Sequence, residues 1–137
     1  MPLYRTTMNE GLSSEEQRAR IADEIGRIHC DVTGAPLDFV NCFFSEVGPN
    51  GAEVGSGEIP EGKVVLMHAT IRAGRTDEEK AKIVSDMTQS VANILGCPVD
   101  EVAFVTDDFP AHWAMERGVI CPAPGTPEEA EWKKRFG

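Results

Sequence analysis

Residues 14–44, SEEQRARIADEIGRIHCDVTGAPLDFVNCFF, and residues 76–106, TDEEKAKIVSDMTQSVANILGCPVDEVAFVT, align without a gap, each residue with the one 62 positions later. Several matched positions are identical: Glu16 and Glu78, Ala19 and Ala81, Ile21 and Ile83, Gly34 and Gly96, Pro36 and Pro98, Asp38 and Asp100, Val40 and Val102. A match of this length at one offset is typical of an internal duplication. The chain is therefore expected to hold two copies of one structural unit.

The first copy, about residues 2–47, has the pattern of a strand, a helix and a second strand. Ser14 takes the place of a helix N-cap and Gly34 that of a C-cap. Between them, apolar residues recur at helical spacing, at Ile21, Ile25, Ile28 and Val32. Extended segments are predicted on either side of the helix, at 3–7 and 39–47.

The second copy, about residues 63–106, repeats this plan. Thr76 and Gly96 stand at the two ends of its predicted helix. Strands are predicted at 64–71 and 101–106. The second copy is therefore another strand, helix and strand in the same order.

Two such units predict one architecture. A helical crossover makes the two strands of a βαβ unit parallel, and two units side by side form a four-stranded sheet with both helices on one face. The fold class is thus α/β, an α+β sandwich. We expect a single domain over residues 1–137, with a surface loop at 48–62 and a C-terminal segment at 107–137 that carries a short helix at 111–117. Because no further helix is left to cover the second face of the sheet, that face is expected to mediate oligomerisation.

Composition narrows the range of functions. The 137 residues include 41% apolar ones, enough for a normal core, and the formal net charge is −10 without any basic run. This charge makes nucleic acid and anionic membranes poor partners. No window is apolar and long enough to span a bilayer, and the sequence begins without a signal-peptide pattern, so we expect a soluble cytoplasmic protein.

The four cysteines are scattered and form no Cys-x-x-Cys pair. Such cysteines are typical of reduced, mostly buried side chains in an intracellular protein. A zinc site would have to gather ligands from distant segments. No metal site is therefore predicted.

Positions that differ in chemistry between the copies are candidates for function. Arg72 and Arg75 flank the turn between the first strand and the helix of the second copy. Two guanidinium groups near a helix start can clamp a carboxylate by bidentate bonds, although turn arginines are more often solvated charges. His29 lies on the flank of the buried face of the first helix and aligns with Val91, which shows that the fold does not need a histidine there.

The N-terminus offers a further candidate, because Met1 is followed by Pro2 at the start of a predicted strand. If Met1 is removed, the Pro2 nitrogen becomes a secondary amine. An α-amino group has a reference pKa of about 7.7 to 8.0, and burial or nearby cations lower it. Pro2 could then serve as an acid or base near neutral pH.

Two other histidines invite weaker readings. His112 and Glu116 are spaced i, i+4 on the predicted helix at 111–117 and form a metal pair, an acid/base pair or an ordinary helix contact. His68 alternates with Leu66 and Thr70 along one strand face and is interpreted as structural.

Taken together, these features resemble the tautomerase superfamily. The resemblance rests on Pro2, the duplicated βαβ unit, His29 and Arg72-x-x-Arg75, and within the superfamily it is strongest to the cis-3-chloroacrylic acid dehalogenase family. It covers nearly the whole chain, with the clearest matches at residues 71–76 (IRAGRT) and 110–118 (PAHWAMERG).

The resemblance implies a role for each of these residues. Pro2, freed of Met1, would be the acid/base catalyst; Arg72 and Arg75 would bind and polarise the substrate carboxylate, and His29 would assist. Glu116 would position or activate water for attack at C3. The resemblance also implies a homotrimer and low tautomerase activity on 2-oxo acids.

One position departs from the family pattern. Val105 aligns where the family carries a catalytic tyrosine, and Tyr4 is the only tyrosine of the chain. A positioned acid/base group contributes typically about 10²- to 10⁴-fold to a rate. The missing tyrosine hydroxyl is therefore expected to weaken dehalogenation more than the chemistry of Pro2.

The sequence thus predicts an enzyme without cofactor or metal that moves protons with Pro2. Its substrate would be a small 2-oxo or 3-unsaturated carboxylate, and its reaction tautomerisation or hydration and dehalogenation. The rival is a non-catalytic ligand- or partner-binding trimer that retains the fold.

Overall fold

The computed structural model describes residues 1–49, 51–52 and 65–137. The strands are β1 (Leu3–Asn9), β2 (Asn41–Val47), β3 (Val65–Arg72), β4 (Val102–Phe109), β5 (Met115–Glu116) and β6 (Val119–Ile120). The α-helices are α1 (Glu15–Thr33), α2 (Asp77–Leu95) and α3 (Pro127–Phe136). Single 3-10 turns lie at Leu37–Phe39, Val99–Glu101 and Ala111–Trp113.

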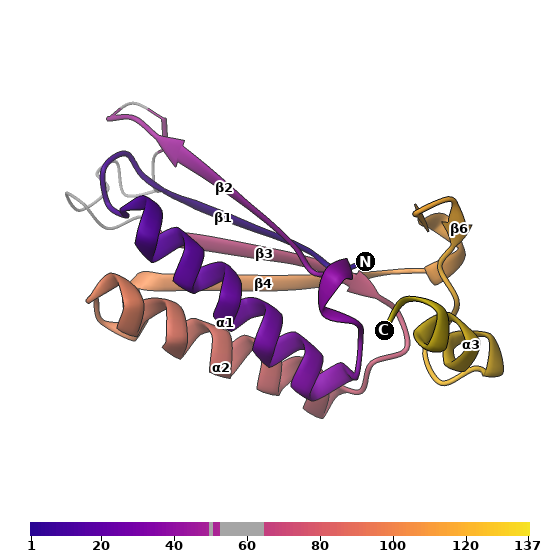
Figure 1. Ribbon diagram of the computed structural model, residues 1–137. Coiled ribbons are helices and arrows are strands. Elements are labelled where there is room, and N and C mark those ends of the chain that lie inside the picture. Colours follow the sequence, from indigo (N-terminus) through magenta and orange to yellow (C-terminus); the bar gives the residue numbers. More distant parts are fainter. Residues whose placement is uncertain (50, 53–64) are drawn as a thin grey trace.

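The four long strands form one mixed sheet in the order β2-β1-β3-β4. Each copy contributes a parallel pair, β1 with β2 and β3 with β4, and the two copies meet through the antiparallel pair of β1 and β3. Both long helices cover the same face of the sheet (Figure 1). The predicted fold class, with its four-stranded sheet and two helices on one face, is confirmed.

The two copies also agree in their local structure. Helices α1 and α2 are each 19 residues long. Both begin with a capping box, built on Ser14 and on Thr76. Both end at a left-handed glycine, Gly34 with φ 67° and Gly96 with φ 70°. The predicted caps are therefore confirmed. The sequence could predict them because each cap depends on residues only a few positions apart.

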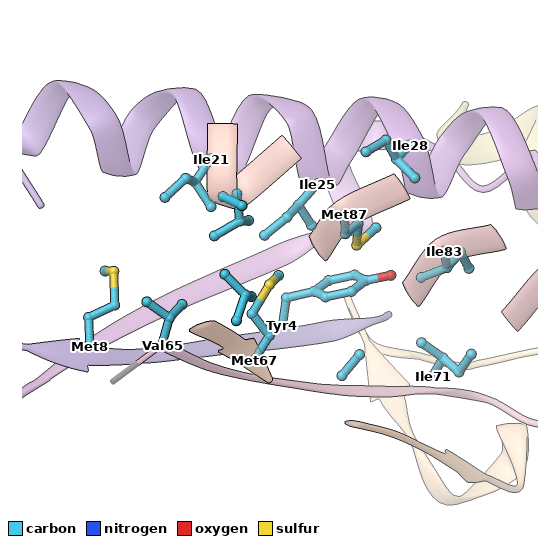
Figure 2. Close-up of a cluster of buried hydrophobic side chains, with 14 residues drawn as sticks. Tyr4, Met8, Ile21, Ile25, Ile28, Val65, Met67, Ile71, Ile83 and Met87 are labelled. Atoms are coloured by element: carbon cyan, nitrogen blue, oxygen red, sulfur yellow. The ribbon is translucent and has the colours of Figure 1, made fainter. Parts of the chain in front are cut away.

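A continuous apolar core lies between the helices and the sheet. Figure 2 shows side chains from α1 and α2 packed against those of β1 and β3, with the aromatic ring of Tyr4 among them. Tyr4, Met8, Ile21, Ile25, Met67 and Met87 are almost completely buried. Alternate residues along each central strand supply the sheet side of this core, as half-buried strands require.

Among the residues that the structure describes, no helix lies over the opposite face of the sheet. Its exposed apolar side chains include Phe43 at 55%, Leu66 at 44% and Val105 at 54%. His68 lies on this face and contacts Asp107, with 2.7 Å between the ring Nε2 and the carboxylate Oδ2. Within the described ranges, none of the helices has the length and hydropathy needed to cross a bilayer.

Some predicted boundaries were wrong. The segment 39–47 begins with the end of a 3-10 turn, because Pro36 starts the turn Leu37–Phe39 and β2 follows only at Asn41. Strand β4 continues beyond 106 to Phe109, which still pairs with Arg72 of β3. Most of the predicted loop 48–62 and the start of the second copy at 63–64 lie outside the described residues.

The C-terminal segment differs most from the prediction. Residues 111–117 form no α-helix; a 3-10 turn at Ala111–Trp113 is followed by the hairpin of β5 and β6. The prediction that His112 and Glu116 form an i, i+4 pair on a helix was therefore wrong. Helix α3, which was not predicted, follows the hairpin.

Candidate active site

The candidate site lies at one end of the sheet, where the chain begins and β3 ends. Leu3 faces Thr70 across the antiparallel pair, so Pro2 comes beside the last residues of β3, which include Arg72. The Pro2 carbonyl accepts the backbone N–H of Asn41 at 3.1 Å. The N-terminus, the β5–β6 hairpin and α3 all gather at this end of the molecule (Figure 1).

The terminal amino group of Met1 is partly buried in this site. Its nitrogen lies 3.0 Å from Oε2 of Glu116. Burial lowers the pKa of this amine, and Glu116 opposes the change. The site thus holds a backbone-derived amine in contact with a carboxylate.

Glu116 is held in place by its hairpin. Arg117 and Gly118 form the two-residue turn between β5 and β6, with φ 52° and 76°. Two successive residues of positive φ are the signature of a type I′ turn, which favours glycine at its second position. The Oε1 atom of Glu116 accepts a hydrogen bond from Asn41 Nδ2 at 3.2 Å, and the same amide donates to the Phe39 carbonyl. Asn41 therefore orients the Glu116 carboxylate, a role that the sequence did not indicate.

His29 is buried near the C-terminal end of α1. Its Nδ1 lies 2.7 Å from the Tyr4 hydroxyl. Burial lowers its pKa to about 3, with further lowering by Arg75, the terminal amino group and Arg72. Burial also raises the pKa of Tyr4, so its hydroxyl keeps its proton. His29 is thus a neutral ring whose pKa the nearby cationic groups lower further, and Tyr4 is a partner that sequence reasoning missed.

Arg72 and Arg75 come together in the site but are not free. Arg72 is only 4% exposed. It donates from Nη1 to the Pro122 carbonyl and from Nη2 to Oε1 of Glu129 at 2.7 Å. Arg75 donates to the Thr33 carbonyl at the end of α1, and its Nη2 lies 3.7 Å from the same Glu129 oxygen. Both arginines therefore converge on one carboxylate oxygen.

That carboxylate belongs to α3 and was missed in the sequence. Burial raises the pKa of Glu129, but the Gly125 N–H and the Arg72 guanidinium outweigh burial and hold it below its ordinary value. The segment from Thr126 to Phe136 does carry a helix signature: an N-cap threonine, proline at the first helical position, acidic residues in the first turn and basic residues in the last. Read as a helix, it would have placed Glu129 and Trp132 on neighbouring positions of one surface.

Other residues singled out in the sequence stay apart from this cluster. Val105 pairs with His68 in the middle of the sheet, on the face without helices. Arg72 lies four positions after His68, a span of about 13 Å along a strand. His112 is exposed on its 3-10 turn. The parts of the chain that the structure describes contain no group of three or more potential metal ligands.

The arrangement places cationic groups, two of which are paired with Glu129, beside an acid/base group. Arg72, Arg75 and the amino group supply positive charge, and neutral His29 supplies a polar ring. Glu116 supplies a carboxylate on the other side of the amine. These are the groups that a proton-transfer reaction on a small carboxylate would need.

Comparison with known proteins identifies the family. Residues 1–135 match the family described as "Putative oxalocrotonate tautomerase enzyme", and the chain belongs to this family of the tautomerase superfamily. A probable tautomerase of Ralstonia nicotianae is 35% identical over 51 residues, which cover 36% of this chain and 73% of that protein.

Solved structures agree in fold. The crystal structure of N1, a member of the cis-3-chloroacrylic acid dehalogenase family, is 32% identical, with a TM-score of 0.88 over 95% of this chain and 89% of N1. FG41 malonate semialdehyde decarboxylase, inhibited by 3-bromopropiolate, is 28% identical, with a TM-score of 0.69 over 86% and 92% of the two chains. A fused 4-OT solved as an asymmetric trimer, at 21% identity and a TM-score of 0.77 over 86% and 94%, shares the fold alone.

Proposed function

We propose that the protein is a cofactor-independent acid/base enzyme that uses Pro2 on small 2-oxo or 3-unsaturated carboxylates. The observation that carries this proposal is the partly buried terminal amine, 3.0 Å from Glu116, at the strand end that also holds Arg72. Similarity to a member of the cis-3-chloroacrylic acid dehalogenase family and to a malonate semialdehyde decarboxylase supports this substrate class, since both compounds are small acids.

The catalytic amine of the proposal is that of Pro2 after removal of Met1. Successive Cα atoms are about 3.8 Å apart, so the new terminus forms within one residue of the present one. The same burial that lowers the pKa of the Met1 amine would act on the Pro2 amine, and Glu116 would oppose it. The balance between these effects sets whether Pro2 begins the reaction as a base or as an acid.

The roles of the other residues follow from their charges. Arg75 and Arg72 bind the substrate carboxylate, and neutral His29 donates a hydrogen bond from Nε2, because its Nδ1 is paired with the Tyr4 hydroxyl. In tautomerisation, Pro2 accepts the proton of the enol hydroxyl and returns a proton to C3. In hydration, Glu116 removes a proton from water while the water oxygen attacks C3, and protonated Pro2 supplies the proton for C2.

We also propose that the molecule is a homotrimer in the cytoplasm, assembled through the sheet face without helices. The exposed apolar side chains Phe43, Leu66 and Val105 on that face support this, because a partner subunit would remove their apolar surface from water. The trimeric fused 4-OT has the same fold.

The enol-keto conversion of phenylpyruvate tests the proposal. Wild-type protein is compared with Pro2→Ala, and Pro49→Ala in an exposed turn serves as the matched control. We expect Pro2→Ala to lose at least about tenfold in kcat/KM while Pro49→Ala stays at the wild-type rate, since a positioned base contributes about 10²- to 10⁴-fold. Intact mass determines in the same samples whether Met1 is absent. Equal rates for wild type and Pro2→Ala would refute the role of Pro2, and rates no higher than the uncatalysed reaction in both would favour the non-catalytic binding protein.

Halide release from cis-3-chloroacrylate separates the two reaction types. Val105 lacks the hydroxyl of the family tyrosine, so we expect slow halide release beside measurable tautomerisation. Val105 lies apart from the site of its own chain, on the face proposed for trimer assembly, so Val105→Tyr should raise halide release if the new hydroxyl reaches the site of a neighbouring subunit. No change with this variant would show that the position has no part in the reaction.

A further inference from the structure

The arginine pair of the candidate site is already occupied. Arg72 is 4% exposed; it bonds a backbone carbonyl and the Glu129 carboxylate, and its guanidinium carbon lies 5.1 Å from the centre of the Trp132 ring. These partners use N–H groups on both terminal nitrogens of Arg72, and the small exposed fraction of the side chain leaves little room for a substrate carboxylate while they remain. Pro122, Glu129 or Trp132 therefore has to move before Arg72 can bind an anion.

Glu129 has the surroundings of a bound carboxylate. Its Oε1 accepts from Arg72 at 2.7 Å and lies 3.7 Å from Arg75. Its Oε2 accepts the Gly125 N–H at 2.8 Å and lies 3.6 Å from Lys133 Nζ. One carboxylate thus pairs with both arginines, as a substrate carboxylate would.

The helix that carries Glu129 is held by a small apolar contact. Trp132 and Phe136 of α3 pack on Phe39, with ring centres 4.5 Å and 5.3 Å apart. Figure 1 shows α3 at the end of the sheet, beyond the layer of α1 and α2. Helix α3 has ten residues and contributes none of them to the main core, so it can separate from the sheet end without opening that core.

We propose that Glu129 is an intramolecular competitor for the carboxylate site, which the substrate carboxylate displaces together with α3. This inference rests on the proposed function, because it concerns the same arginines. The exchange replaces one carboxylate by another, so the charge of the site is unchanged. Glu129 then sets the affinity of the site and restricts it to ligands that carry a full negative charge, because a neutral analogue cannot replace the ion pairs that it breaks.

Binding of propionate, an unreactive small carboxylate, tests the proposal without depending on catalysis. Its dissociation constant is measured from the broadening of its NMR signals, with the neutral isostere propionamide as the matched ligand. Glu129→Gln keeps the shape and an acceptor oxygen for Arg72 but removes the competing charge. We expect the propionate dissociation constant to fall about tenfold in this variant, while propionamide binding remains weak in both proteins.

A second variant separates competition from structural support. Phe136→Ala leaves Glu129 intact but weakens the packing of α3, so displacement becomes easier and propionate should bind more tightly. If α3 instead holds the arginines ready for the ligand, both variants would bind propionate more weakly. Thermal unfolding followed by circular dichroism shows that each variant is folded.

Movement of α3 is observed through Trp132. In a Trp113→Phe background only one indole N–H signal remains, because the chain has two tryptophans. We expect saturating propionate to shift this signal. Propionate binding with equal affinity to wild type and Glu129→Gln, and without an indole shift, would overturn the inference and leave the proposed function standing. No propionate binding to either protein would overturn the inference and the carboxylate role of the arginines together, whereas phenylpyruvate turnover would still report on Pro2.

Discussion

The buried, neutral state of His29 predicts a specific dependence of stability on pH. His29 is 3% exposed and its pKa is lowered to about 3, compared with about 6.5 for an exposed histidine. Below pH 6.5 the unfolded chain binds a proton at His29 that the folded protein does not bind. The contribution of neutral His29 to the free energy of unfolding is therefore fully present above pH 6.5 and is lost as the pH falls from 6.5 toward 3.

The size of the effect follows from these two pKa values. One pKa unit corresponds to about 1.4 kcal/mol, and integration from pH 7.5 to pH 5.0 gives a loss of about 2 kcal/mol in the free energy of unfolding from this residue alone. The substitution His29→Val removes the titration, and a valine already occupies the equivalent position of α2, where Val91 is buried. The variant starts less stable at pH 7.5 by about 1–3 kcal/mol, because the buried Tyr4 hydroxyl loses its partner.

Urea unfolding at the two pH values, at one protein concentration, measures the difference. The stability gap between wild type and His29→Val should narrow by about 2 kcal/mol between pH 7.5 and pH 5.0. His112→Val is the matched control, because it removes an exposed histidine and leaves His29 in place. A gap for His29→Val that is the same at both pH values would refute the reasoning, since His29 would then titrate alike in the folded and unfolded chains.

Three further predictions concern the surroundings of the site. Gly118→Val places a β-branched residue at φ 76° and so strains the turn that holds Glu116. Stability measured by thermal unfolding should fall by about 1–3 kcal/mol, and kcat for phenylpyruvate should fall as well. Asn41→Asp replaces the donor to Glu116 by a second carboxylate, and kcat should fall more than in Asn41→Ala, whereas equal losses would argue against an orienting hydrogen bond. Leu66→Glu charges the sheet face without helices and should reduce the molar mass measured by sedimentation equilibrium, with an unchanged mass counting against assembly through that face.

The sequence determined the two βαβ copies by itself, because their signals are local. Ser14 and Thr76 start their helices and Gly34 and Gly96 end them through bonds that span only a few residues. The duplication also singled out His29, Arg72 and Arg75 as positions where the chemistry differs between matched sites. That comparison needs no coordinates, since a shared fold makes the matched positions equivalent.

Only the tertiary structure decided how these groups are paired. Arg72 meets Glu129 across 57 residues, and Asn41 meets Glu116 across 75. Neither contact leaves a periodic or capping signal, because each arises when the antiparallel pairing of β1 and β3 brings the chain start, the end of β3 and the C-terminal segment to one sheet end. The sequence therefore indicated an arginine pair for a carboxylate, and the folded chain shows that it supplies a carboxylate of its own.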